Sequence, residues 1–275
     1  LRPIESSVII FYRILLVAVV CVIAALFKYS INEILEPLKD KKLILTYIAA
    51  GIIITVNWSI YIWAVNADYV IQTCIGYYIE PLMVCIFGVV IFKEKLNMYK
   101  KAALGFALAG VAVIIIYFRQ VPLIALGLAI SFSIYAAIKK NLNKPPILSL
   151  LYETVFLAPF ALIVIIYLEV TGQGAISSLG SGELYKYGLL MFCGLFTAFP
   201  LGLFADAANK INLFVLGLTE YISPTLSLII GIFLFSEPFE KVQLIAFAII
   251  WVGLVFFSYG EFKYYKLSRE NLNEG

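Results

Sequence analysis

The chain has 275 residues, of which 63% are hydrophobic and 13% are charged, and its mean hydropathy is +1.00. A soluble domain of this length cannot bury so many apolar side chains, whereas a lipid bilayer accepts them when backbone groups are bonded within helices or a closed barrel. The net charge of +3 comes from Lys and Arg residues spread along the edges of apolar runs, so it indicates membrane orientation and no nucleic-acid partner. The composition excludes an ordinary soluble protein.

Nine apolar runs, each about as long as the roughly 20 residues that a helix needs to cross a bilayer, divide the chain. They do not alternate in polarity as barrel strands do, so they predict an all-α polytopic membrane protein with nine transmembrane helices. In chain order we expect them at Ser7–Lys28, Leu43–Val65, Val70–Phe92, Met98–Phe118, Leu123–Ile138, Ile147–Leu168, Leu184–Ala205, Leu213–Phe235 and Val242–Tyr259. Only Glu169–Glu183 is long enough for a real loop, and the residues after Gly260 form a polar tail.

An internal repeat relates the two halves of the chain. Tyr78–Tyr117 aligns without a gap on Tyr221–Gly260 at an offset of 143 residues, so that Tyr-Ile-Glu-Pro meets Tyr-Ile-Ser-Pro. Further matches place Gly88, Phe92, Glu94, Ala103 and Gly110 on Gly231, Phe235, Glu237, Ala246 and Gly253. Such a repeat changes the predicted fold from a single row of helices to two copies of one structural unit, one in each half of the chain.

One helix of the second repeat has no partner in the first. Residues 7–28 pair with residues 147–168, which leaves residues 123–138 alone, and their twin would precede Leu1. We therefore expect the chain to begin inside a longer protein of ten helices, five in each repeat. The predicted domains are residues 1–118, a first repeat without its first helix, residues 119–260, the second repeat, and residues 261–275, a polar cytoplasmic tail.

The lysines predict the orientation of the repeats. An odd number of helices per repeat requires the second repeat to enter the membrane from the opposite side. The connection after residue 92 carries Lys93, Lys95, Lys100 and Lys101, while its twin in the second repeat carries only Lys241. Lysine and arginine accumulate on cytoplasmic loops, so we expect an inner-membrane, multi-pass protein with a cytoplasmic C-terminus.

Several motifs resemble the EamA portion of the drug/metabolite transporter superfamily, and within it the RarD-type permeases. They are Asn57-Trp58-Ser59-Ile60-Tyr61-Ile62-Trp63-Ala64-Val65-Asn66, Gly76-Tyr77-Tyr78-Ile79-Glu80-Pro81-Leu82, Ala125-Leu126-Gly127-Leu128-Ala129 and Tyr221-Ile222-Ser223-Pro224-Thr225-Leu226. The resemblance covers Pro3 to about Gly260. It implies two inverted five-helix repeats around a central substrate cavity, with the last helix of each repeat at the periphery. Glu80 departs from the neutral amide that the family favours.

Ionisable residues within the apolar runs are candidate site residues, because even lenient insertion scales assign them a cost of about 2.5–3.5 kcal/mol. Arg13 and Glu153 occupy equivalent places in the two repeats, and we expect an interior pair that takes part in substrate binding. The alternative is that Arg13 reaches toward the outer membrane interface and Glu153 toward the inner one, each the nearer interface for that side chain.

Glu80 and Glu220 form a second candidate group. Under the 143-residue offset Tyr77 meets Glu220, and Glu80 meets Ser223. The two positions lie three residues apart on one helix face and just before a Pro that frees a backbone carbonyl. Broken helices at matching positions of two repeats are a sequence signal of a transporter's site. We expect these acids to carry a proton or to receive a cationic substrate, or else to be neutral and bonded to nearby backbone.

Amide and aromatic side chains complete the predicted site. Asn57 and Tyr61 share one helix face with Ala64, and Trp63 lies on another, a mixture that suits an amphipathic organic substrate. Tyr12, Tyr78, Tyr135, Tyr152 and Tyr221 are expected to line the same space, although many of the 18 Tyr residues must simply pack. Alternatively, Trp58 and Trp63 belong to an interfacial aromatic belt and Asn57 bridges helices.

The absent residues limit the chemistry. The chain has no His, which excludes His-based zinc sites, haem ligation by His and the usual acyl-transfer triads. Its four Cys lie within apolar runs without paired spacing, so we interpret them as packing residues. We expect no cofactor, no metal and no enzymatic activity, although a membrane-embedded enzyme acting on a lipid or amphipathic substrate is the alternative.

The functional prediction is a secondary active transporter, an exporter of small organic metabolites or drugs that works by alternating access. Proton exchange is the favoured coupling, and a passive facilitator fits the same residues. The expected partners are a small-molecule substrate, membrane lipid and protons, and the sequence is compatible with a homodimer. Glu94 and Glu237, which match across the repeat, are expected to cap the helices that follow them.

Overall fold

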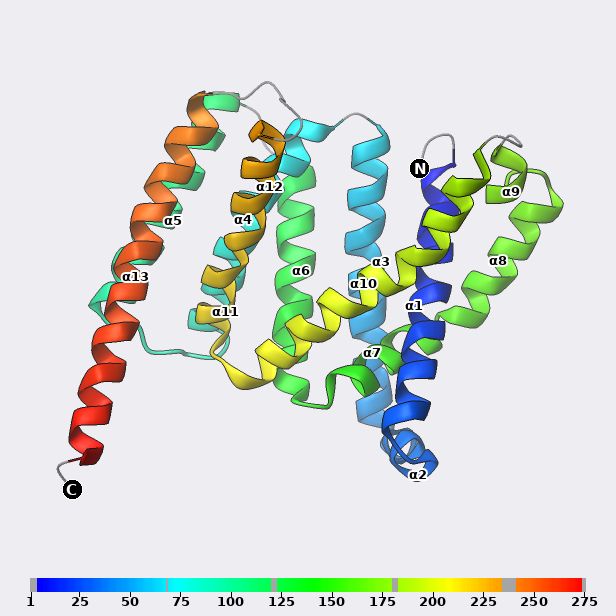
Figure 1. Cartoon of the computed structure of the whole chain (residues 1–275), viewed down its shortest axis with the longest axis horizontal. Helices are drawn as coiled ribbons and strands as arrows, with labels where there is room; N and C mark the ends of the chain where they lie inside the picture. Colours follow the sequence, from blue (N-terminus) through cyan, green and yellow to red (C-terminus); the bar gives the residue numbers. More distant parts are fainter. Residues whose placement is uncertain (1–3, 68, 120–122, 180–182, 234–240, 274–275) are drawn as a thin grey trace. The chain divides into compact units, whose positions relative to one another are not determined.

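The computed structural model describes residues 4–67, 69–119, 123–179, 183–233 and 241–273, and all its regular elements in these ranges are helices (Figure 1). Six of the described helices are long and apolar enough to cross a membrane, or seven if one bent pair counts as a single span. They are α1 (Ser6–Lys28), α3 (Lys41–Asn66), α5 (Met98–Phe118), α6 (Leu123–Leu142), α10 (Leu184–Lys210), α13 (Lys241–Asn273) and the pair α7 (Pro146–Val155) and α8 (Ala158–Val170). The two other expected spans contain α4 (Val70–Val90), and α11 (Leu213–Glu220) with α12 (Ile222–Phe233).

The predicted helix starts are closer to the structure than the predicted ends. The helix Met98–Phe118 has the expected bounds, and its Asn97 side chain accepts a hydrogen bond from Lys100 N at 2.8 Å as an N-cap. By contrast α6 continues four residues past the expected end at Ile138, and α13 continues as helix to Asn273 where a polar tail was expected. The longer α6 matters most, because it brings Lys139 into the helix.

Two expected helices are broken in the structure. Residues 147–168 form α7 and α8, which meet at a bend of 49° close to Pro159. Residues 213–233 form α11 and α12, which meet at Tyr221, three residues before Pro224. Proline removes one helical hydrogen bond and clashes with the carbonyl four residues earlier, which explains breaks at these places. Pro81 lies inside α4 without ending it, so only one of the two matched prolines coincides with a break.

A short connection links α1 to α3 through α2 (Ile31–Leu35) and the 3-10 helix η1 (Glu36–Lys39). Ser30 and Glu33 form a reciprocal capping box at the start of α2. The backbone N–H of Ser30 lowers the pKa of the Glu33 carboxyl. Asp40 caps α3 by accepting hydrogen bonds from Lys42 N and Leu43 N.

The described helices form two compact units. Unit 1 contains Leu1–Val70 and Ile134–Ile211, and unit 2 contains Ile71–Ser133 and Asn212–Gly275. Each unit therefore draws helices from both halves of the sequence, and α6 begins in unit 2 and ends in unit 1.

In unit 1, glycines allow helices to pack closely on α1 and α3. Figure 1 shows α10 running obliquely across α1, and a Cβ atom on Gly194 would lie 2.6 Å from the Leu16 carbonyl carbon. On α3, a Cβ atom on Gly51 would lie 2.1 Å from the Glu153 carbonyl oxygen. Small residues at such crossings are typical of membrane helices, where van der Waals contact replaces the hydrophobic effect as the source of association.

In unit 2, α5 packs along α13 through reciprocal glycine contacts. A Cβ atom on Gly110 would lie 2.9 Å from the Ala246 carbonyl oxygen, and one on Gly253 would lie 3.2 Å from the Ala103 carbonyl oxygen. The two contacts exchange partners under the 143-residue offset of the sequence repeat. Equivalent residues of the two repeats thus make equivalent contacts on each other's helix.

The Gly51 contact predicts a position-specific loss of stability. Replacing Gly51 with Ala forces α3 away from α7, and we expect a loss of about 1–3 kcal/mol of unfolding free energy. Gly105 is an exposed glycine of α5 with open space around its Cβ position, and Gly105→Ala is the control, with an expected gain of about 0.5–1 kcal/mol. Thermal unfolding in detergent measures both, and equal effects of the two substitutions would contradict the close contact.

Candidate functional site

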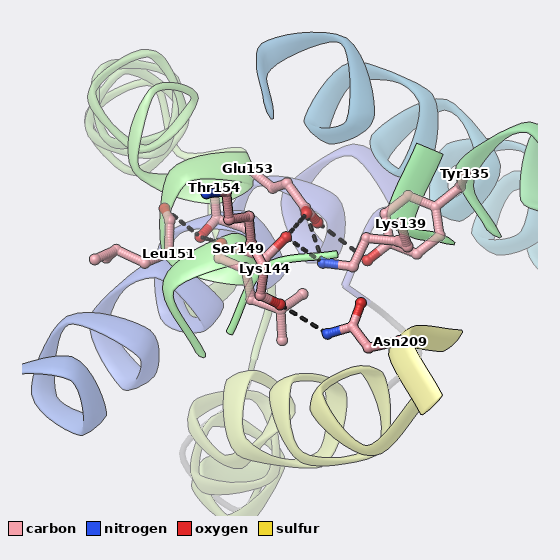
Figure 2. Close-up of polar contacts among 9 residues, drawn as sticks. Tyr135, Lys139, Lys144, Ser149, Leu151, Glu153, Thr154 and Asn209 are labelled. Atoms are coloured by element: carbon pink, nitrogen blue, oxygen red, sulfur yellow. Dashed lines mark hydrogen bonds and ion pairs between the residues drawn. The ribbon is translucent and has the colours of Figure 1, made fainter. Parts of the chain in front are cut away.

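A buried ion pair joins α6 to α7 in unit 1. Lys139 Nζ lies 2.6 Å from Glu153 Oε1, and the two side chains are 2% and 0% exposed (Figure 2). Lys139 is the fourth residue after Tyr135 on α6, and Glu153 is the fourth after Ser149 on α7, so each helix presents both of its residues on one face.

Other side chains on the same two helices form hydrogen bonds with both members of the ion pair. Ser149 Oγ accepts from Lys139 Nζ at 2.7 Å and donates to Glu153 Oε1 at 2.8 Å, and Tyr135 OH donates to Glu153 Oε2 at 3.0 Å. Both carboxylate oxygens therefore accept hydrogen bonds. A buried pair is tolerated when its charges are close and its remaining lone pairs and protons are satisfied, as they are here. We call Tyr135, Lys139, Ser149 and Glu153 the α6–α7 network.

The end of α10 is tied to the turn between α6 and α7. Lys140 Nζ donates to the Ile211 carbonyl oxygen at 2.6 Å. Asn209 Nδ2 donates to the Lys144 carbonyl oxygen at 2.8 Å (Figure 2). The turn reverses the chain at Asn143, whose φ of 44° is in the left-handed region that Asn tolerates better than most residues. These contacts hold one end of unit 1 together.

The predicted interior pair of Arg13 with Glu153 is wrong. The partner of Glu153 is Lys139, which directly follows the expected helix end at Ile138. The cause is the longer α6, because four further residues of helix carry Lys139 back onto the face of Tyr135. The four-residue spacings of Tyr135 with Lys139 and of Ser149 with Glu153 are the sequence signal that could have identified the network.

Arg13 lies instead against an aromatic ring of α3. Its guanidinium carbon is 5.6 Å from the centroid of the Trp58 ring, which is a cation–π contact. Arg13 is partly exposed, and its Nε atom is buried without a hydrogen-bond acceptor among the described residues. Trp58 is buried, which does not fit a lipid-facing belt.

Tyr12 and Tyr152, two of the candidate tyrosines of unit 1, contact different partners. Tyr12 OH donates to Glu169 Oε1 at 2.9 Å, and Glu169 also accepts from the backbone N–H of Ala175 at the start of α9 (Ala175–Ser178), so Tyr12 fastens α1 to α8 and α9. Tyr152 stacks on Tyr47 with ring centroids 5.2 Å apart. Both stacked hydroxyl groups are buried and have no hydrogen-bond partner among the described residues.

The three candidate residues of α3 differ in burial. Asn57 is buried, Tyr61 is partly buried and packs against the apolar core around Tyr12, and Trp63 is 51% exposed with its ring 5.4 Å from that of Tyr69. Trp63 thus lies on the outer surface of α3, as the interfacial alternative expected, whereas Asn57 and Tyr61 face the interior of unit 1.

In unit 2, Glu220 is a buried acid at a helix break. Both of its carboxylate oxygens are buried and have no hydrogen-bond partner among the described residues, and Glu80 is close enough to interact with it electrostatically. Glu220 is the last residue of α11, and Tyr221 at the break is fully buried and donates its hydroxyl to the Tyr78 carbonyl oxygen at 3.0 Å. The structure therefore brings the two acids close enough to repel each other, and the ion pairs of the described residues include neither acid.

Two further candidates of unit 2, Tyr77 and Ser223, have exposed side chains. Tyr77 is 39% exposed and Ser223 is exposed. Among the candidates in this unit, Tyr78, Glu80, Glu220 and Tyr221 are the interior ones.

Glu94 caps a different helix from the one expected. Its carboxylate oxygens accept from Leu213 N at 2.7 Å and from Phe214 N at 2.8 Å, at the start of α11, whereas Asn97 caps the helix that follows Glu94. A carboxylate at this position satisfies free N–H groups and stabilises the positive end of the helix. Its repeat partner Glu237 lies outside the described residues.

These helices and buried charges define a multi-pass membrane protein, and comparison with known proteins identifies its class. The model of the EamA-like transporter family matches residues 1–116 and 121–259. An uncharacterized transporter of Bacillus subtilis, YojE, is 35% identical over 86% of this chain and 78% of its own length. A protein RarD of Streptomyces exfoliatus is 35% identical over 88% of this chain and 75% of its own.

The fold has a counterpart among solved structures. A crystal structure superposes with a TM-score of 0.69 at 16% identity, covering 93% of this chain and 88% of that one, which shows a shared fold. The chain belongs to the EamA-like transporter family, and the resemblance seen in its motifs is confirmed. It is a membrane transporter of the drug/metabolite type.

The α6–α7 network predicts a large asymmetry between single and double substitutions. Lys139→Met leaves the Glu153 carboxylate buried without its cation, and we expect a loss of about 3–5 kcal/mol of unfolding free energy. Replacing both residues with Met removes the unpaired charge, so the double variant should be more stable than Lys139→Met. Unfolding temperatures in detergent measure the difference.

The control for this experiment is Lys210→Met. Lys210 pairs with Asp206 at 2.6 Å at the surface, with side chains 69% and 43% exposed, and such pairs contribute about 0–1 kcal/mol. A Lys139→Met variant no less stable than Lys210→Met would contradict the importance of the buried pair.

Proposed function

We propose that the chain is a secondary active transporter that exports small organic metabolites or drugs across the cytoplasmic membrane by alternating access, in exchange for protons. Two inverted repeats of five helices would supply the moving parts. The reciprocal contacts of Gly110 with Ala246 and of Gly253 with Ala103 support this symmetry, because equivalent residues of two opposed copies would meet in that way.

The observation that carries the coupling is the Glu220 carboxyl group. A carboxylate buried without a partner is costly, and Glu80 adds a second negative charge nearby. A proton or a cationic group that reaches Glu220 removes this cost, so the site has a physical reason to take up one or the other. Its position at the break between α11 and α12 is typical of ion sites in secondary transporters.

The distribution of lysine supports a cytoplasmic C-terminus and contacts with lipid phosphates. The segment 93–101 carries four Lys residues, and the tail after Gly260 adds Lys263, Lys266 and Arg269. Positive charge accumulates on the cytoplasmic side of membrane proteins, which favours this orientation.

Transport by the purified full-length protein in liposomes tests the proposal. We expect counterflow of at least one solute among amino acids, purines and cationic drugs, and faster accumulation when a pH gradient is applied in the direction that drives exchange. Glu220→Gln should abolish the stimulation by the gradient, because an amide cannot carry the proton. Glu261→Gln is the matched control, since Glu261 is an exposed acid paired with Lys100.

The outcomes separate the alternatives. Counterflow that never responds to a pH gradient would indicate a passive facilitator. Absence of counterflow together with catalytic turnover of a lipid or amphipathic substrate would indicate a membrane-embedded enzyme and would reject the transporter mechanism.

A further inference from the structure

Arg13 is a cation of unit 1 that forms no ion pair with an acid in the described part of the chain. It lies in α1, seven residues after the first residue of that helix, and its guanidinium group is stacked on the buried Trp58 ring of α3. Nε has no acceptor among the described residues, and the described ion pairs do not include Arg13.

The acids on the helices packed against α1 are already engaged. Glu153 of α7 is paired with Lys139 and bonded to Ser149 and Tyr135. Glu169 of α8 accepts from Tyr12 OH and from the N–H groups at the start of α9.

The other charged residues on the helices packed against α1 lie at or near helix ends. On α3 they are Lys41 and Lys42, and on α10 they are Lys186, Asp206 and Lys210, of which the last two pair with each other. Lys186 pairs with Glu183. The positive charge of Arg13 therefore has no compensating carboxylate in the described part of this unit.

The geometry favours a planar anion as the missing partner. The guanidinium carbon lies over the Trp58 ring, 5.6 Å from the ring centroid, while the side chain remains partly exposed. A guanidinium group held in this way presents a rigid fork of N–H donors that matches a carboxylate with two parallel hydrogen bonds. The neighbouring core contains the rings of Tyr12, Tyr61 and Tyr187, which suit an apolar planar body beside the charge.

We infer that Arg13, held by Trp58, binds the carboxylate of an aromatic organic anion, which is the substrate class of this transporter. The inference rests on the proposed function for the statement that the bound anion is transported. It differs from that proposal in naming the charged group of the substrate and the residue that receives it.

Direct binding tests the inference without requiring transport. The full-length protein is placed in nanodiscs and titrated with benzoate, phenylacetate and indole-3-acetate, each against its neutral amide. We expect at least one carboxylate to bind more tightly than its amide. Failure of all three to do so in the unmodified protein would overturn the inference, whatever the variants do.

Three variants assign the binding to the guanidinium fork. Arg13→Gln should raise the Kd of the bound carboxylate by about 10- to 100-fold, the range expected for a lost charge-assisted pair. Arg13→Lys should retain part of the affinity, because it keeps the charge and loses the planar fork. Lys28→Gln, at the other end of α1, is the control and should leave the Kd unchanged.

A lipid phosphate is the competing partner for Arg13, and the same preparations distinguish it. If Arg13→Gln lowers the phospholipid that copurifies in detergent but leaves carboxylate binding unchanged, Arg13 serves a lipid contact and the inference is wrong. Carboxylate binding without counterflow would reject the transport proposal alone. Counterflow of neutral solutes without any carboxylate preference would reject the anion site alone.

Discussion

The buried Lys139–Glu153 ion pair is the constraint on which the arrangement of unit 1 depends. An unpaired charge at 0–2% exposure would be too costly to keep, so α6 and α7 must lie close enough for a 2.6 Å contact. Ser149 and Tyr135 then satisfy the remaining carboxylate positions. The Glu153 backbone carbonyl also packs against Gly51 of α3, so α6 and α3 both contact α7 at Glu153.

The buried and partly buried charges discussed above fall into two physical classes. The α6–α7 network is internally neutral and hydrogen-bonded, and we assign it to stability. Glu220 of unit 2 and Arg13 of unit 1 lack a compensating charge among the described residues, and we assign them to function. A membrane protein retains such groups at a cost, and the cost is reduced when a proton or a substrate arrives.

The sequence predicted those parts of the fold that depend on local hydrophobicity. The bounds of α5 were correct because Asn97 supplies its own cap and the apolar run is uninterrupted. The bend near Pro159 was not located, since the run of apolar residues continues across it, whereas the break at Tyr221 lies three residues before Pro224, one of the two matched prolines at which the sequence predicted a broken helix. Lys139 was placed outside its helix for a related reason. An apolar run ends at its first charged residue, so the expected helix stopped at Ile138, whereas in the structure the helix continues and the Glu153 carboxylate of the next helix neutralises the Lys139 charge. The acids Glu80 and Glu220 were identified because the internal repeat places them at matching positions. Repeat symmetry pairs Arg13 with Glu153 of the equivalent helix, so it could not identify Trp58 of α3 as the contact of Arg13.

The central claim is that Glu220, and not the paired Glu153, exchanges a proton when substrate binds. Proton release on substrate binding, measured with a pH-sensitive dye in weakly buffered solution, tests this most directly once counterflow has supplied a substrate. The account predicts that protein folded with Glu153→Gln still releases protons and that Glu220→Gln does not. Unchanged release by Glu220→Gln would contradict it.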